Sequence, residues 1–204
     1  MPTPLPGHPF RTAIIAGGRA TRLGGAAKGL LEVGGRRILD RLVDACREAS
    51  GGLPLLVAND PGAGSWHPDL RVVPDARPAG GALAGLYTAV VEAPAPVVCV
   101  AWDMPFVPVA LLRALAAGLA SHDACLPAGG GRRGVEPLCA AYGPACAPPM
   151  REALDRGDLR AIAFHDGVRV TVLPEERVAV FGDPARLFFN VNTAEDLAAA
   201  RGMA

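Results

Sequence analysis

Short apolar runs alternate along the chain with stretches whose apolar residues recur at helical spacing. Apolar runs bounded by glycine, proline or polar residues are typical of buried strands. The run 97–101, V-V-C-V-A, has no polar residue, as expected of a strand in the middle of a mostly parallel sheet. The predicted extended segments are residues 12–16, 30–33, 53–58, 71–73, 97–101, 124–126, 138–142 and 168–173.

Helical patterns fill the intervals between these runs. In residues 38–49, apolar side chains are spaced three and four apart before the stop Ser50-Gly51-Gly52. Strands that alternate with helices predict an α/β fold, here a single three-layer domain around a doubly wound, mostly parallel sheet. Helices are predicted at 38–49, 81–92, 107–119, 150–155, 159–164 and 193–201, the last capped by Thr193 with Asp196 three residues on.

Length and composition agree with one globular domain. The chain has 204 residues, of which 50% are hydrophobic, and we expect the domain to span residues 11–204. Residues 1–10 hold four prolines and lack a basic region followed by an apolar core, so we interpret them as a flexible tail and not as a signal peptide. No apolar run approaches the length of a membrane span.

Charge and cysteine usage narrow the class further. The formal net charge is +0, so we expect no nucleic-acid or membrane partner, and an anionic ligand must be held by a local cluster. Five cysteines without a C-x-x-C pair predict neither a disulfide framework nor a zinc site. We therefore expect a cytoplasmic protein.

Ligands of doubly wound sheets bind at the carboxyl ends of the strands. The first such segment, 12–28, reads T-A-I-I-A-G-G-R-A-T-R-L-G-G-A-A-K. Its glycines let backbone N–H groups approach a ligand, and Arg19, Arg22 and Lys28 add positive charge, which suits a polyphosphate. Lys28 is the only lysine among 20 basic residues, and a compact ammonium fits crowded phosphate oxygens better than a guanidinium does. The alternative is a solvated loop lysine.

The spacing of this loop excludes two familiar phosphate-binding motifs. A P-loop needs Ser or Thr after its lysine, where this chain has Gly29, and a dinucleotide fingerprint opens a helix directly. The loop instead resembles the signature A-G-G-x-x-x-R-x-G-x-x-K of nucleotidyltransferases related to sugar-nucleotide pyrophosphorylases. Together with F-F-N-V-N-T-A-E-D-L at 188–197, it is most similar to the molybdenum cofactor guanylyltransferase family.

The resemblance implies a Rossmann-like nucleotidyltransferase fold and gives roles to residues that follow the strands. Asn190 and Asn192 would lie on the acceptor side, although both amides could equally only tie their turn to neighbouring backbone. The catalytic residues would be Arg22, Lys28 and Asp103. The nucleotide would be bound by Ile15, Ala16, Gly17, Gly18, Lys28, Asn59, Asp75, Gly81 and Asp103.

Asp103 is the predicted metal ligand. It emerges from the apolar strand 97–101, and one carboxylate that faces a triphosphate is enough protein ligation for Mg²⁺. The alternative is that Asp103 only caps the following turn and helix. Trp102 stands where the family usually has a small residue or cysteine, and we expect its ring to change the shape of the pocket.

Asp75 precedes a glycine-rich turn and helix that match the family less closely than the segment around Asp103 does. Its alternative role is a surface ion pair with Arg71 or Arg77. Three positions depart from the asparagine or proline that the family usually has: Val57, Ala82 and Ala194.

By this resemblance, the protein would transfer GMP from GTP to molybdenum-bound molybdopterin and release pyrophosphate, with Mg²⁺ as cofactor. No general base is needed, because the acceptor phosphate is already ionised at neutral pH. Two alternatives stay open: a cytidylyltransferase of the same superfamily, and a nucleotide-binding regulatory module without turnover. The resemblance is also compatible with partners among other cofactor-biosynthesis proteins and target-enzyme chaperones.

Overall fold

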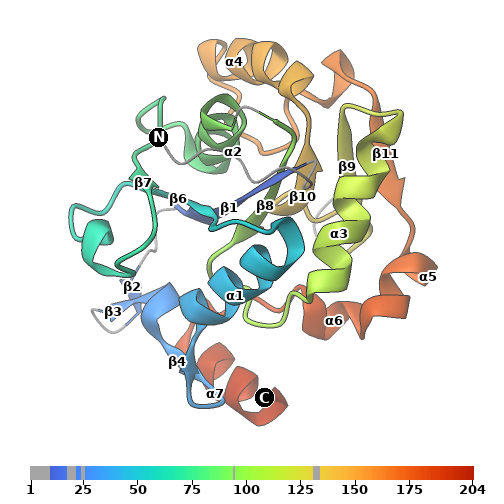
Figure 1. Cartoon of the computed structure of the whole chain (residues 1–204). Coiled ribbons are helices and arrows are strands. Elements are labelled where there is room, and N and C mark those ends of the chain that lie inside the picture. The colour runs from blue at the N-terminus through green and yellow to red at the C-terminus, as the bar shows by residue number, and fades with distance from the viewer. Residues whose placement is uncertain (1–9, 18–21, 24–25, 94, 131–133) are drawn as a thin grey trace.

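The structure, a computed structural model, describes residues 10–17, 22–23, 26–93, 95–130 and 134–204, with backbone only for residues 22, 23 and 26. In this part of the chain, the centre is a seven-stranded sheet with the order β11-β9-β10-β8-β1-β6-β7 (Figure 1). Its strands are β1 (Arg11–Ala16), β6 (Leu55–Ala58), β7 (Val72–Val73), β8 (Val97–Ala101), β9 (Ala124–Pro127), β10 (Cys139–Tyr142) and β11 (Val170–Leu173).

The paired strands of this sheet are parallel except for β10, which runs antiparallel to both β8 and β9. The predicted α/β fold with a mostly parallel sheet is confirmed. β1 pairs with β6 on one side and with β8 on the other, so the direction of winding reverses at β1. In open α/β sheets, ligands bind beside such a reversal, at the carboxyl ends of the strands.

Helices cover both faces of the sheet, and the two faces have separate hydrophobic clusters. In the view of Figure 1, α2 and α4 lie above the sheet and α1 lies below it. The helices are α1 (Ile38–Ser50), α2 (Gly81–Glu92), α3 (Val109–Ala117), α4 (Ala147–Asp155), α5 (Glu175–Val178), α6 (Pro184–Leu187) and α7 (Ala194–Met203). The 3₁₀ turns are η1 (Lys28–Leu30), η2 (Ala63–Ser65), η3 (Gly118–Ala120), η4 (Pro144–Cys146), η5 (His165–Gly167) and η6 (Ala179–Phe181).

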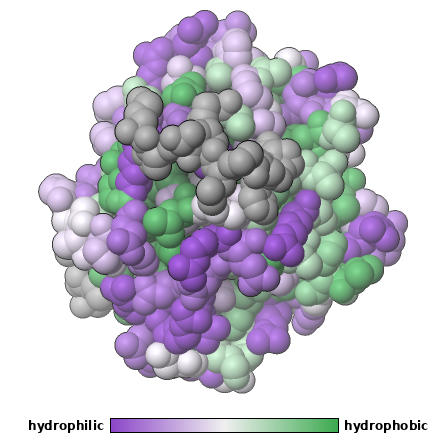
Figure 2. Space-filling view, viewed as in Figure 1, coloured by the Kyte–Doolittle hydropathy of each residue, from purple (hydrophilic) through white to green (hydrophobic). Residues whose placement is uncertain are grey.

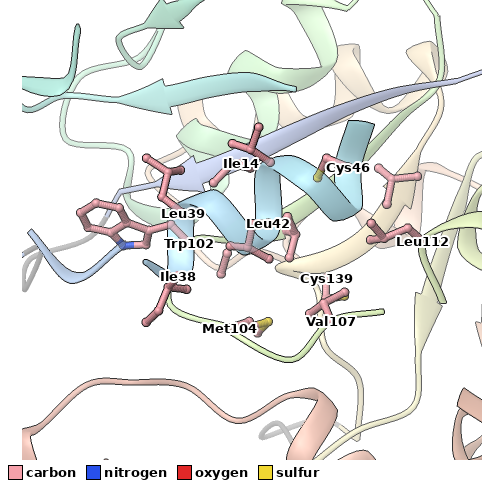
Figure 3. Close-up of a cluster of buried hydrophobic side chains, with 14 of the residues drawn as sticks. Ile14, Ile38, Leu39, Leu42, Cys46, Trp102, Met104, Val107, Leu112 and Cys139 are labelled. Atoms are coloured by element: carbon pink, nitrogen blue, oxygen red, sulfur yellow. The ribbon is translucent and has the colours of Figure 1, made fainter. Parts of the chain in front are cut away.

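Alternation along the central strands explains why both faces are apolar. Ile14 and Val100 belong to the cluster under α1 and α3, while their neighbours Ile15 and Cys99 belong to the cluster under α2 and α4. Successive side chains of a strand point to opposite faces, so a strand covered on both sides must be apolar throughout. Figure 3 shows part of the first cluster, where Ile14 meets side chains of α1.

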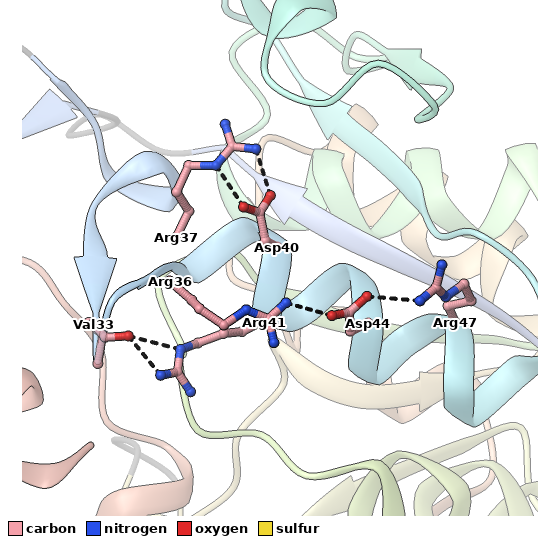
Figure 4. Close-up of polar contacts among 7 residues, drawn as sticks. All are labelled: Val33, Arg36, Arg37, Asp40, Arg41, Asp44 and Arg47. Carbon is pink, nitrogen blue, oxygen red and sulfur yellow. Dashed lines mark hydrogen bonds and ion pairs between the residues drawn. The ribbon is translucent and has the colours of Figure 1, made fainter.

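The outer face of α1 is charged. Its inner face buries Ile38, Leu39 and Leu42, and Gly51 ends the helix in the left-handed conformation with φ 72°. On the outside, one carboxylate bridges two arginines, and further arginines contact backbone or carboxylate oxygens (Figure 4). In Figure 2, hydrophilic residues gather over α1 accordingly.

Four short strands complete the part of the chain that the structure describes. They form two antiparallel pairs beside the main sheet. Gly34 and Gly35, with φ 58° and 72°, form the two-residue turn of the second pair, which requires this conformation. The pairs are β2 (Arg22–Leu23) with β3 (Ala26–Ala27), and β4 (Glu32–Val33) with β5 (Arg36–Arg37).

Some of the predicted elements differ from the structure. The helix predicted at 159–164 is wrong: these residues form an irregular segment and turns, and Phe164 fills the core as a single side chain against Tyr142. The prediction took a cluster of apolar residues for a helical face. α7 confirms its predicted cap, because Thr193 and Asp196 form a capping box. No described helix is long and apolar enough to cross a membrane.

Phe10, the last residue of the predicted tail, is buried in the core. The rest of that tail lies outside the described residues, so its flexibility stays a prediction. All five cysteines are buried and free, and burial raises the pKa of each thiol.

Candidate nucleotide-binding site

The predicted site residues meet along the carboxyl edge of four parallel strands. The winding reverses at β1, which lies between β8 and β6, and β7 follows β6 at the edge of the sheet. Ile15 and Ala16 are buried at the end of β1, and Gly17 is exposed just beyond it. Gly18 and the side chain of Arg22 lie outside what the structure describes, so their predicted roles stay predictions.

Lys28 is buried, with only 3% of its surface exposed. Its Nζ donates a hydrogen bond of 2.6 Å to Oδ1 of Asn192, a residue 164 positions further along the chain. A buried ammonium needs polar partners, because losing its water without compensation costs several kcal/mol. The solvated-loop alternative for Lys28 is therefore wrong: this side chain is placed by the fold.

Asp103 lies beside Lys28, two residues beyond the end of β8. Partial burial raises the pKa of its carboxyl, and the positive charge of Lys28 opposes that rise. Its backbone carbonyl accepts a hydrogen bond of 2.9 Å from Val191 N–H. The side chain does not cap α3, because the N-cap position of that helix is Pro108 and no side chain caps it.

The turn 190–193 joins this arrangement from the far end of the chain. Val191 binds the Asp103 backbone while Asn192 binds Lys28, so adjacent residues contact both charged positions. The carboxylate of Asp196 accepts N–H bonds from Asn192 and Thr193 at 2.9 and 2.8 Å, which lower its pKa. The capping box of α7 thus also fixes the backbone of Asn192.

The two predicted acceptor-side asparagines differ in what they contact. Asn192 is exposed and reaches Lys28, whereas the Nδ2 of Asn190 donates to the Phe188 carbonyl at 2.9 Å within its own turn. Both asparagines belong to one sequence motif, but their contacts in the structure differ. An acceptor-side role for either one stays a prediction.

A second group lies on the other side of β1, where β6 and β7 end. Asn59 Nδ2 donates to Asp75 Oδ2 at 2.7 Å, and Asn59 Oδ1 accepts from Asp75 N–H at 2.8 Å. Burial raises the pKa of the Asp75 carboxyl, and the bond from Asn59 opposes the rise. The described ion pairs of Arg71 and Arg77 go to Glu92 and Asp155, so the surface ion-pair alternative for Asp75 is wrong.

Glycines shape the approach to this second group. Gly81 opens α2 with φ 61°, a conformation that side chains rarely adopt. A Cβ on Gly85 would lie 2.8 Å from Ile15 Cγ2 and 3.7 Å from Asp75 Oδ1, so only glycine allows α2 to pack this closely on β1. At Gly85, about one turn after its start, α2 therefore passes next to Asp75.

Two features of the site were missed from the sequence. Trp102 is not a ring in an open pocket: it is only 2% exposed and stacks on Trp66, with ring centroids 5.0 Å apart. Asp196 was predicted as a capping residue, but not as a support for Asn192. The first depends on Trp66, which is distant from Trp102 in the sequence, although an aromatic at 102 directly before the predicted metal ligand was a signal for it. The second is local, because Asp196 binds the backbone N–H of Asn192 four positions before it.

A seven-stranded α/β fold with an ammonium and a carboxylate at its switch point is the arrangement of a nucleotidyltransferase. Comparison with known proteins narrows the class. The chain belongs to the MobA-like NTP transferase domain family, whose match covers residues 12–170.

Sequence relatives of known name match nearly the whole length of the chain. A probable molybdenum cofactor guanylyltransferase from Pelotomaculum thermopropionicum is 34% identical over 94% of this chain and 91% of its own length. A molybdenum cofactor guanylyltransferase from Cereibacter sphaeroides is 32% identical, covering 93% of this chain and 94% of its own. The crystal structure of molybdopterin-guanine dinucleotide biosynthesis protein A from Archaeoglobus fulgidus matches with a TM-score of 0.79 at 25% identity, covering 95% of this chain and 97% of that one.

The burial of Lys28 generates a testable prediction. Lys28→Arg should lower kcat/KM for nucleotidyl transfer by roughly tenfold to a hundredfold. The guanidinium is too large for the buried position of the ammonium, so the hydrogen bond to Asn192 is lost, and one charge-assisted hydrogen bond contributes about 1.5–3 kcal/mol. Lys28→Met, which also loses the charge, should be worse. Pyrophosphate release measures both, and equal rates for wild type and Lys28→Arg would mean that the lysine has no part in the reaction.

Proposed function

We propose that this nucleotidyltransferase transfers GMP from GTP to the phosphate of molybdenum-bound molybdopterin, releasing pyrophosphate and forming the guanine dinucleotide cofactor. The observation that carries the proposal is the buried ammonium of Lys28, held by Asn192 beside Asp103 at the switch point of the sheet. Relatives that match more than nine-tenths of the chain bear the name molybdenum cofactor guanylyltransferase.

The reaction asks the protein to align two anions and to neutralise charge. Lys28 binds the triphosphate, and the backbone N–H groups after β1 approach its oxygens. Arg22 is assigned to the same triphosphate by the signature. The acceptor phosphate is ionised at neutral pH and attacks the α-phosphorus, so no side chain has to remove a proton. Asn192 is exposed and lies on the acceptor side in this proposal.

Nucleotidyltransferases of this kind generally use a divalent metal, and we propose Mg²⁺. The described residues include no cluster of three or more His, Cys, Asp or Glu that could hold a metal alone. The carboxylate of Asp103 is the kind of hard oxygen donor that Mg²⁺ prefers. Asp103 would supply one hard oxygen, with phosphate oxygens and waters as the other ligands. When bound, Mg²⁺ neutralises charge on the phosphates. Burial raises the pKa of the Asp103 carboxyl, and the positive charge of Lys28 opposes that rise and so favours the ionised form.

Asp75 is proposed to select guanine. Guanine N1–H and N2–H₂ form adjacent donors that one carboxylate can accept together. A carboxylate has about four lone-pair sites, so the bond to Asn59 leaves capacity for the base. Cytosine would place a ring acceptor opposite one of these oxygens, which is unfavourable.

The protein should accordingly bind and use GTP, with CTP, UTP and ATP much weaker. Asp75→Asn should reduce the preference for GTP over CTP by roughly 5- to 150-fold, which corresponds to about 1–3 kcal/mol of lost donor–acceptor matching. The matched control, Asp69→Asn at an exposed loop position, should leave the preference unchanged. The measurement is a titration of each nucleotide with Mg²⁺, followed by pyrophosphate release in the presence of molybdopterin.

Two outcomes of this titration would contradict the proposal. A clear CTP preference would make the protein a cytidylyltransferase. Tight GTP binding without turnover on molybdopterin would make it a regulatory nucleotide-binding module.

Asp103→Asn should lower Mg²⁺-dependent turnover by about a hundredfold or more, because the one proposed protein ligand of the metal loses its charge. Most of the affinity for GTP should remain. The free energy of unfolding at pH 7 should not fall, since a raised pKa in the folded state means that folding disfavours the charged carboxylate. Kinetics at saturating Mg²⁺ together with denaturant unfolding make the test, and near wild-type turnover would remove Asp103 from the metal site.

A further inference from the structure

Both tryptophans of the chain lie in a single stack next to the Lys28 side of the site. The chain has 2 tryptophans, Trp66 and Trp102. Their rings are stacked at 5.0 Å between centroids with an angle of 22° between planes, and both are buried.

Trp102 presses directly on the backbone of Gly29. A Cβ added to Gly29 would lie 2.6 Å from Trp102 Cε3, closer than real side chains approach, so only glycine allows the contact. Gly29 follows Lys28 in the chain, and Trp102 precedes Asp103. The contact therefore joins the two pieces of backbone that carry the ammonium and the carboxylate.

Trp66 supports the Trp102 ring, and its own backbone is anchored. Trp66 N–H donates to the Ala63 carbonyl at 3.1 Å, and the Trp66 carbonyl accepts from Arg37 Nη1 at 3.1 Å. Arg37 is in turn fixed by two hydrogen bonds to Asp40, at 2.7 and 2.8 Å (Figure 4). The backbone N–H of Trp102 donates to the Ile15 carbonyl at 3.2 Å, so both ends of the stack are held.

We propose that the Trp66–Trp102 stack positions Lys28 and Asp103, here called the phosphate-binding pair because one would bind the triphosphate and the other its metal ion. The Trp102 ring contacts Gly29 and is supported by Trp66, and it thereby sets the spacing between Lys28 and Asp103. This inference rests on the proposed function of the same site. Trp66 and Trp102 are positioning residues, because they act through the backbone of their neighbours. A core role alone would require only that the volume be filled.

The test uses two changes that disturb the stack from opposite sides. Trp102→Ala removes the ring, and Gly29→Ala pushes against it. Gly64→Ala is the control for the glycine change, because a Cβ at Gly64 meets nothing within 4 Å. Leu112→Ala is the control for a cavity, since Leu112 is buried in the same cluster but stands at the opposite end of it from Trp102 (Figure 3).

Inorganic triphosphate with Mg²⁺ is the first probe, because it needs the phosphate-binding pair but neither base nor acceptor. Calorimetry should show affinity reduced about tenfold in Trp102→Ala and Gly29→Ala, as expected when a charge-assisted hydrogen bond is misaligned. Both controls should bind as wild type does. Tryptophan emission of the wild type should change on binding, since both fluorophores lie in the stack.

Turnover of GTP with molybdopterin is the second probe, measured below the unfolding transition of every variant. Trp102→Ala and Gly29→Ala should lower kcat by about tenfold to a hundredfold with a smaller change in KM for GTP, because misplacement by about 1 Å costs on the order of a hundredfold while the base contacts remain. Trp66→Phe, which keeps a flat ring, should retain more activity than Trp66→Ala.

The outcomes separate the inference from the proposed function. Wild-type triphosphate affinity in both Trp102→Ala and Gly29→Ala would overturn the inference, as would equal losses in Leu112→Ala. If a variant fails to fold, the other stack variant and the Trp66 pair decide by the same criteria. Triphosphate binding by the wild type without GTP turnover would overturn the proposed function alone.

Discussion

The hydrogen bond between Lys28 and Asn192 is the interaction on which the site depends. An ammonium with 3% exposure must have polar partners nearby, and here its hydrogen-bond partner comes from the opposite end of the chain. The loop after β1 carries the charge, the segment after β8 carries Asp103, and the turn before α7 binds both. These three segments are far apart in the sequence, and only the folded α/β domain brings them together.

This constraint explains why the last helix matters to a site at the first strand. The capping box of α7 uses Asp196 to hold the backbone N–H groups of Asn192 and Thr193. The Val191 N–H donates to the Asp103 carbonyl, which lies just beyond the end of the central strand β8. A motif that reads as a helix cap in the sequence therefore also holds the polar partner of the buried lysine.

Much of the fold could be predicted from the sequence, because local patterns determine it. The bounds of β8 and α2 match the prediction, since one is an uninterrupted apolar run and the other is bounded by glycine and proline. The antiparallel direction of β10 was not predicted, because strand direction depends on tertiary connections. The segment 159–164 was taken for a helix because its apolar residues are dense, although Phe164 packs singly.

The site was predictable where strand ends determine it. Asp103, Asn59 and Asp75 each follow a predicted strand, and the rule that parallel strands share one edge brought them to the correct edge of the sheet. Other features of the site depend on contacts between distant segments. These are the bond of Lys28 to Asn192, which Asn190 does not share, and the contact of the Trp102 ring with Gly29. Neither spacing nor composition carries that information.

The most direct test of this account is a double-mutant cycle on the free energy of unfolding, measured without ligand for wild type, Lys28→Met, Asn192→Ala and the double variant. If Asn192 holds the buried ammonium, the two changes should be coupled by about 0.5–3 kcal/mol, as found for residues in contact. Additivity within about 0.5 kcal/mol would mean that the two side chains do not interact in solution, and it would contradict the account.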